Sequence, residues 1–82
     1  MYFVYIVKCA DNTFYTGIAT ELERRIEEHN GSDKGAKYTR VRRPVSLVYS
    51  EEYADRSSAS KREYEIKKKM SRAKKLKLIE SS

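Results

Sequence analysis

The sequence predicts a small α+β domain, with one sheet of three mostly antiparallel strands flanked by helices. Aromatic and β-branched runs separated by short turns indicate the strands, and apolar residues at helical spacing behind capping residues indicate the helices. The expected order of elements is β-β-α-β-α-α. Because 82 residues suffice for one compact core, we expect a single domain over residues 1–82.

The first two strands are expected to form a hairpin. Residues 2–8 are an aromatic and β-branched run, and after a short turn residues 14–17 resume this pattern until Gly17 ends it. Antiparallel pairing brings Tyr5 and Tyr15 near each other, an arrangement that serves packing more often than chemistry. At Gly17, a side chain would block the close approach of a substrate or of a neighbouring backbone.

The first helix follows the hairpin. Thr20 and Glu23 have the spacing of a capping box, so Thr20 is the expected N-cap. The helix is expected to end near Gly31, which suits the left-handed position after a helix. Leu22 and Ile26 mark its buried side.

Two polar residues of this helix lie beside its apolar side. Arg25 and His29 are four residues apart and share a face, whereas Arg24 is expected to be solvated. His29 has an ordinary explanation, because the helix macrodipole favours a histidine cation near the C-terminal end. A role as a site residue would need partners that the sequence does not show.

A basic loop and the third strand come next. Residues 31–44, rich in Gly, Lys and Arg, are predicted to be a loop. Its cations interleave with an aromatic ring, and such a set can hold phosphates while the ring stacks on bases. The members of this set are Lys34, Lys37, Tyr38, Arg40, Arg42 and Arg43.

The third strand is predicted over residues 45–53, where side chains alternate. Val45, Leu47 and Tyr49 are expected on one face of this strand, and Ser46, Val48 and Ser50 on the other. A second helix is expected from about Arg56 to Met70, and Ser71 is the expected N-cap of a third helix that ends near Ile79.

Glu63 is the most informative residue of the second helix. Ala59, Ile66 and Met70 define the core-facing stripe of this helix, and Glu63 lies on that stripe, while Glu65 points away from it. A carboxylate in such a position costs free energy unless it meets a cation or a metal ion. The alternative is that Glu63 lies at the edge of the stripe and pairs with an arginine.

The charge balance favours a polyanionic partner. The chain has 18 Lys and Arg against 12 Asp and Glu, a formal net charge of +6, and cations release counterions when they neutralise phosphates. A solvated helix face would also explain the lysines of the last two helices, and membrane surfaces attract the same charge. With one cysteine and no signal or membrane-spanning pattern, the sequence fits the cytoplasm.

Several motifs follow one another in a fixed order: Val4-Tyr5-Ile6, Tyr15-Thr16-Gly17, Leu22 to Ile26, and a later helix with Glu63. In this order the set resembles the GIY-YIG nuclease superfamily, and the resemblance covers nearly the whole chain. The stretch from Gly35 to Pro44 is similar to that of short, stand-alone bacterial members. Phe3 and Thr16 depart from the usual motif letters, but they leave both tyrosines in place.

The resemblance implies a role for each matching residue. Arg25 matches the catalytic arginine and Glu63 the metal-binding glutamate, which with water holds one divalent ion, usually Mg²⁺ (or Mn²⁺). Tyr5 or Tyr15 would orient or deprotonate the attacking water, and we favour Tyr5, with a pKa lowered by nearby arginine and metal charge. His29 matches a position that is often histidine in the family.

The resemblance therefore implies a metal-dependent endonuclease that acts on nucleic acid, with DNA and DNA repair intermediates as the expected substrates. We expect it to act as a monomer, with a protein partner for targeting as one source of specificity. A non-catalytic DNA- or RNA-binding module of the same fold is the alternative, and a purely structural or protein-interaction domain is a third. A binding module would keep its affinity for nucleic acid in EDTA and without Glu63, whereas an enzyme would lose cleavage in either case.

Overall fold

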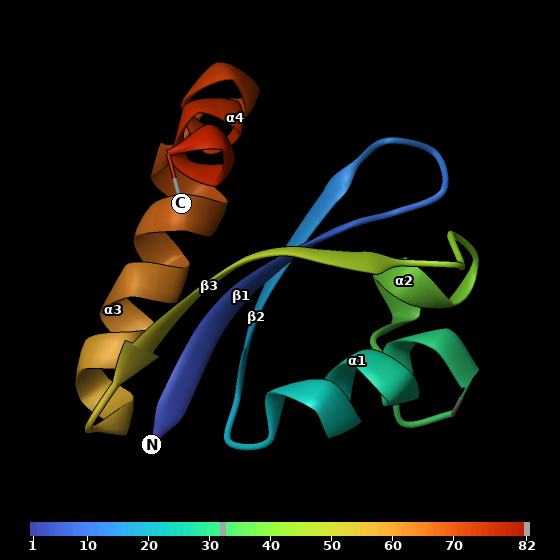
Figure 1. The fold of residues 1–82 in the computed structure, drawn as a ribbon, viewed down its shortest axis with the longest axis horizontal. Helices are drawn as coiled ribbons and strands as arrows, with labels where there is room; N and C mark the ends of the chain where they lie inside the picture. The colour runs from blue at the N-terminus through green and yellow to red at the C-terminus, as the bar shows by residue number, and fades with distance from the viewer. Residues whose placement is uncertain (32, 82) are drawn as a thin grey trace.

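The computed structural model describes residues 1–31 and 33–81 and confirms the α+β class. Three strands form one antiparallel sheet in the order β2-β1-β3: β1 (Tyr2–Lys8), β2 (Phe14–Ala19) and β3 (Ser46–Tyr53). Helices lie on both sides of this sheet (Figure 1): α1 (Leu22–Gly31) and α2 (Lys37–Arg40) on one, and α3 (Arg56–Tyr64), the π-helical segment η1 (Glu65–Lys69) and α4 (Arg72–Glu80) on the other.

The central strand β1 supplies core residues to both faces, because successive side chains of a strand point in opposite directions. Val4 and Ile6 are fully buried against α3, where they meet Ala59 and Ile66. This contact confirms the predicted core-facing stripe of the second helix. Tyr5 and Val7 face the other way, and Leu22 and Ile26 of α1, with further residues, pack against their cluster.

A bulge in β3 breaks the predicted alternation of that strand. Ile6 pairs with Tyr49, but the next residue of β1 pairs with Leu47, so Val48 is an extra residue. As a result, Val48 and Tyr49 both pack on the α3 side, and Val45 packs on the α1 side. Val45, Leu47 and Tyr49 were expected on one face of β3, and that part of the prediction is wrong, because Val45 and Tyr49 pack on opposite sides and Leu47 is 42% exposed.

The helix ends match the predictions in part. Ser71 caps α4 by accepting from Lys74 N, as predicted, and Asp55 caps α3 by accepting from Ser58 N. The predicted cap of α1 is wrong: the helix begins at Leu22, and the Thr20 side chain makes no hydrogen bond with any described residue. Gly31 is the last residue of α1 and does not adopt a positive φ, so the left-handed ending is also wrong.

The predicted basic loop contains a short helix. Residues 37–40 form α2, whose buried Thr39 donates its hydroxyl to Ala36 O at 3.0 Å. The sequence predicts a loop here because this stretch is rich in charge and glycine and has no apolar stripe.

Within the described residues, no helix is long and apolar enough to cross a bilayer.

An ion pair fixes α3 on the sheet. Arg62 Nε lies 2.9 Å from Glu51 Oε1, and Arg62 Nη2 lies 2.9 Å from Glu51 Oε2, a two-pronged contact between α3 and β3. Tyr53 donates to Glu51 Oε1 at 2.6 Å, and Tyr49 also donates to this carboxylate. Because two bonds define a plane, they restrict the rotation of α3 about its axis and so the direction of the neighbouring Glu63.

Replacement of Ile66 by alanine should lower the free energy of unfolding by about 3 kcal/mol, because Ile66 is fully buried between α3 and the sheet. Chemical denaturation at neutral pH measures this change. Leu47→Ala is the matched control, since it removes a similar apolar side chain that is 42% exposed, and it should cost less than about 1 kcal/mol. Equal losses in the two variants would contradict the described packing of α3.

Candidate active site

A buried hydrogen-bond chain links β1, α1 and α2. Tyr5 Oη lies 2.7 Å from His29 Nε2, and His29 Nδ1 lies 2.8 Å from Thr39 Oγ1. Tyr5 is 1% exposed, and both His29 and Thr39 are fully buried. Buried polar groups without partners cost free energy, so this chain holds three elements together only because each member is paired.

The direction of these bonds follows from the last member. Thr39 donates its only hydroxyl proton to Ala36 O at 3.0 Å, so Thr39 Oγ1 is left to accept the Nδ1 proton of His29. His29 Nε2 then carries no proton and accepts from the Tyr5 hydroxyl. The approach of Ala36 N to Nδ1, at 3.5 Å, is the longer and weaker contact.

His29 is neutral in this environment. Its pKa is lowered from 6.5 to about 4, mainly by burial and also by the nearby Arg25 cation, although Glu28 acts in the opposite direction. The explanation from the sequence, a cation stabilised by the macrodipole, is therefore wrong. Its role is to join two hydroxyl groups.

Gly17 makes room for the Tyr5 ring. Gly17 pairs with Tyr5 in the middle of β2, and a Cβ there would lie 2.5 Å from Tyr5 Oη. The expected close approach is therefore made by a side chain of the neighbouring strand. The prediction that Gly17 ends the strand is wrong, because β2 continues to Ala19.

Four predicted site residues come together around the Tyr5 hydroxyl. Burial raises the pKa of Tyr5 to about 12; the Arg25 guanidinium opposes this rise, while Tyr15 and Glu63 add to it. The charges of Arg25 and Glu63 thus act on one hydroxyl, although they come from α1 and α3. The expected lowering of the Tyr5 pKa is wrong for the protein alone, because desolvation outweighs the single cation.

Arg25 is held in place by a residue of its own helix and by one that follows the helix. Its Nη1 donates to Glu28 Oε1 at 3.0 Å and to Lys34 O at 2.7 Å. Arg25 also forms part of the wall of an open surface cavity of about 370 Å³, together with Arg24 and Arg56. Guanidinium groups on this wall suit an anionic ligand, because their planar donors match phosphate oxygens.

Glu63 is a half-buried carboxylate that forms no ion pair with any described residue. The alternative from the sequence, pairing with an arginine, is wrong, because the adjacent Arg62 bonds to Glu51 and Glu65 instead. Among described residues, no three acidic, His or Cys side chains cluster to hold a metal ion. One carboxylate still fits Mg²⁺, which keeps several waters and accepts one or two protein ligands.

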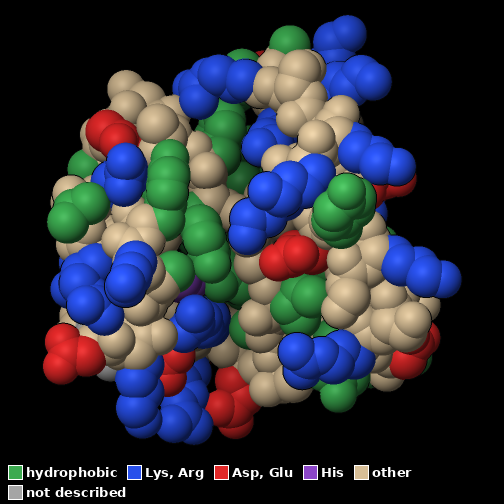
Figure 2. Space-filling model, turned by 180° about the vertical axis from the view of Figure 1, so that it is seen from behind, with side chains coloured by type: hydrophobic (Ala, Val, Ile, Leu, Met, Phe, Trp, Pro, Cys, Tyr) green, Lys and Arg blue, Asp and Glu red, His purple; other side chains and the backbone are tan. Residues whose placement is uncertain are grey.

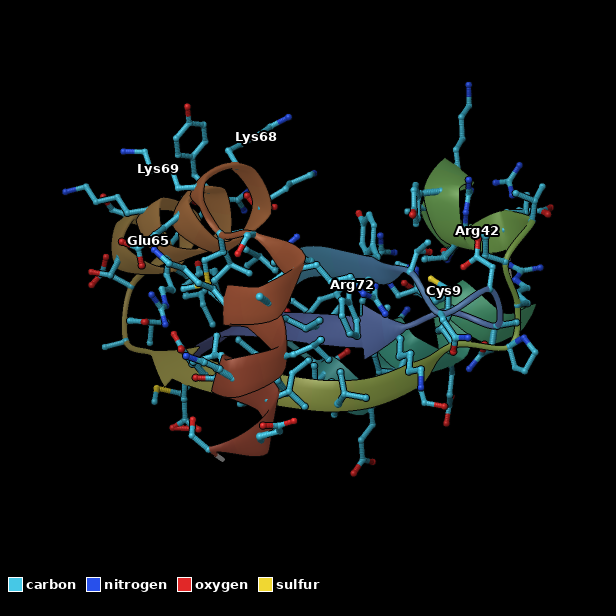
Figure 3. The ribbon with its side chains drawn as sticks, turned by 90° about the horizontal axis from the view of Figure 1, so that it is seen from above. Cys9, Arg42, Glu65, Lys68, Lys69 and Arg72 are labelled. Carbon is cyan, nitrogen blue, oxygen red and sulfur yellow. The ribbon has the colours of Figure 1, made fainter. Side chains whose placement is uncertain are left out.

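A hollow separates the two groups of helices on the face seen in Figure 2, and we call it the central groove. Lysine and arginine side chains line both of its sides in that view. Figure 3 shows Lys68 and Lys69 of η1 on one side of the molecule and Arg42 on the opposite side. Lys67 Nζ lies 5.7 Å from the ring centroid of Tyr15, whose edge meets the His29 ring at 5.3 Å.

The predicted nucleic-acid-binding residues are of two kinds: some are exposed to solvent, and others are held by contacts within the protein. Lys34, Lys37 and Arg40 are exposed. Arg42 lies over the Tyr38 ring, 4.0 Å from its centroid, and pairs with Asp11. The last member, Arg43, donates to His29 O at 2.5 Å and so satisfies a carbonyl at the end of α1; its contact with nucleic acid stays a prediction.

Sequence reasoning missed two residues of this site. Thr39 was hidden by the loop prediction, although a hydroxyl between Tyr38 and Arg40 is a polar residue that could turn inward. Lys67 was grouped with the solvated lysines. Helical spacing gave no sign of its contact with Tyr15, because η1 is a π-helical segment that alters the direction of its side chains.

Residues 1–77 match the family profile described as the GIY-YIG catalytic domain. The chain belongs to the GIY-YIG family. The match includes all three strands and the helices that carry Arg25 and Glu63. The resemblance predicted from the motifs is thereby confirmed.

Similar GIY-YIG proteins are short bacterial chains. The UPF0213 protein DP2720 of Desulfotalea psychrophila is 62% identical over 81 residues, which are 99% of this chain and 73% of that protein. The UPF0213 protein SH2523 of Staphylococcus haemolyticus is 58% identical over 79 residues, 96% and 94% of the two chains. The solution structure of UPF0213 protein BH0048 from Bacillus halodurans is 43% identical, with a TM-score of 0.63, and covers 100% of this chain and 86% of that one.

Gly17→Ala should lower the free energy of unfolding by about 2 kcal/mol or more, because the new Cβ displaces the Tyr5 ring from His29. Denaturation measures the loss, and the imidazole signals of His29 in NMR report the broken bond. Gly31→Ala is the matched control: apart from its chain neighbours and its own helix, no atom of the described residues lies within 4 Å of a Cβ at this position, and alanine favours a helix, so this variant should be as stable as the wild type or more so. A neutral Gly17→Ala would contradict the described contact.

Stability should fall on acidification between about pH 6.5 and about pH 4. In that range the unfolded chain protonates His29 while the folded protein does not, so protons favour unfolding. The full difference corresponds to about 3 kcal/mol at about 1.4 kcal/mol per pH unit. Unfolding curves across this range test it, with His29→Gln as the variant that cannot titrate. Equal pH slopes in the wild type and His29→Gln would contradict the neutral, buried histidine.

Proposed function

We propose that this GIY-YIG domain is a metal-dependent endonuclease that hydrolyses phosphodiester bonds of nucleic acid, with DNA as the expected polymer and repair or processing as its context. The observation that carries the proposal is the convergence of Arg25 and Glu63 on the Tyr5 hydroxyl. A cation, a carboxylate without an ion-pair partner and a hydroxyl with a buried proton acceptor serve no obvious packing purpose. Together they supply what phosphodiester hydrolysis requires.

Arg25 is suited to hold the phosphate. Glu28 and the Lys34 carbonyl fix its guanidinium before any substrate binds, so little side-chain entropy remains to be lost. Its charge would stabilise the additional negative charge that develops on the phosphate oxygens as the bond breaks. The adjoining cavity, with Arg24 and Arg56 on its wall, gives the neighbouring part of the backbone a place to lie.

Tyr5 and His29 are suited to move a proton. At neutral pH the Tyr5 hydroxyl keeps its proton, so it orients the attacking water without first becoming a phenolate. As the water attacks, its proton passes to Tyr5 Oη, and the proton of Tyr5 passes to His29 Nε2 at 2.7 Å. Thr39 continues to accept from His29 Nδ1, so the new cation keeps both hydrogen bonds.

Glu63 is the residue that would hold the metal ion. Its carboxylate lacks an ion pair and lies in a part of the chain where the formal charge is otherwise strongly positive. When bound, a hydrated divalent ion such as Mg²⁺ or Mn²⁺ neutralises phosphate charge and stabilises the leaving oxygen. The role of Arg62 is then to orient Glu63, because its contacts with Glu51 fix α3 on the sheet.

Cleavage should require Glu63 and Arg25 but not the two control residues. In the presence of Mg²⁺, Glu63→Ala and Arg25→Ala should each lower the rate on labelled DNA by at least about 100-fold. Glu65→Ala is the matched control for the carboxylate, and Lys74→Ala, which removes an exposed cation of α4, is the control for lost positive charge; both should leave the rate nearly unchanged. Gel assays with a panel of single-stranded, duplex, flapped and branched DNA, and with RNA, measure the rates.

Removal of the metal by EDTA should abolish cleavage in the same assay. If no substrate is cut, while the wild type and Glu63→Ala bind nucleic acid equally well in a salt-sensitive manner, the endonuclease proposal is wrong. The alternative, a DNA- or RNA-binding module, would then be preferred.

A further inference from the structure

Four side chains form a continuous row, and we call them the stacking row: Lys67, Tyr15, Tyr38 and Arg42. Lys67 Nζ lies 5.7 Å from the Tyr15 ring, and the Tyr15 and Tyr38 rings stack with centroids 5.9 Å apart and planes inclined by 24°. The Arg42 guanidinium lies 4.0 Å from the Tyr38 centroid. Four separate segments, η1, β2, α2 and the residues after α2, supply these groups.

The row differs from ordinary core packing in three respects. Tyr38 is 37% exposed, so its ring adds little to the core. Within the described residues, neither the Tyr15 nor the Tyr38 hydroxyl makes a hydrogen bond. A cation lies at each end of the row, and among the described residues only Arg42 pairs with a carboxylate, that of Asp11.

Arg42 is prepared for a planar partner. It donates to Asp11 Oδ2 at 3.0 Å and to Tyr38 O at 2.8 Å, and these bonds hold its guanidinium over the Tyr38 ring. Nucleobases stack on both aromatic rings and guanidinium planes. The outer end of the row is thus the Arg42 guanidinium beside the partly exposed Tyr38 ring, and at its inner end the Tyr15 ring lies against His29.

We propose that the stacking row binds one unpaired nucleobase at its Tyr38 and Arg42 end, so that the substrate carries single-stranded nucleotides beside the scissile bond. In a duplex, neighbouring bases cover both faces of each internal base, and only an overhang, a flap or a single strand offers an unpaired base with an open face. This inference rests on the proposed function for the position of cleavage. The stacking itself requires no metal and no reaction.

Binding without metal tests the inference. The probes are a labelled single-stranded DNA oligonucleotide and the blunt duplex of the same length, titrated in EDTA. Tyr38→Leu keeps an apolar side chain but removes the ring, and it should weaken single-strand binding by about tenfold while duplex binding changes by less than about twofold. Tyr38→Phe keeps the ring and should bind both probes as the wild type does.

Tyr64→Leu is the matched control, because Tyr64 is also an exposed tyrosine near lysines, 56% exposed, but lies outside the row. It should bind both probes normally. Circular dichroism confirms that each variant folds. If Tyr38→Leu does not fold, Arg42→Lys replaces it as the test variant, since lysine keeps the charge but loses the plane.

Unchanged single-strand binding in the test variant would overturn the inference, and so would equal weakening on both probes. The outcome of the cleavage assay is independent of the outcome of this binding assay. Selective loss of single-strand binding without any cleavage by the wild type would support the stacking row and reject the endonuclease. Cleavage that depends on Glu63, with unchanged binding by the Tyr38→Leu variant, would support the endonuclease and reject the stacking row.

Discussion

The hydrogen bond between Tyr5 and His29 is the contact on which the candidate site depends. It joins the central strand to α1, and through Thr39 it reaches α2. All three side chains are buried, so each pays a desolvation cost that only the complete chain offsets. This bond requires glycine at position 17, since any side chain there would occupy the place of the Tyr5 hydroxyl.

A second polar cluster on the opposite face complements the first. Glu51 accepts hydrogen bonds from Arg62 and from two tyrosines of its own strand, and in this way fixes α3. The two clusters hold α1 and α3 against opposite faces of one small sheet. The charges of Arg25 and Glu63 act on the Tyr5 hydroxyl from these two helices, and a hollow separates the two groups of helices on the face seen in Figure 2.

The sequence was sufficient for the fold class, the order of the main elements and the GIY-YIG family, because strand runs, helical stripes and short motifs are local patterns. Periodicity also selected Glu63 over Glu65: the charge of Glu63 acts on Tyr5, while Glu65 is exposed. Local patterns failed where tertiary contacts prevail. The end of α1 at Gly31 follows the prediction, but the bulge that puts Val45 and Tyr49 on opposite sides of the sheet depends on the pairing of β3 with β1.

By itself, the sequence determined which residues match the family's motifs and which face of each helix is buried, because residue type and spacing are written along the chain. Only the tertiary structure decided their electrostatic state. Burial makes His29 a neutral acceptor and raises the pKa of Tyr5, and desolvation of this kind depends on atoms from several elements at once. The same holds for the contact of Lys67 with Tyr15, which exists only where η1 crosses β2.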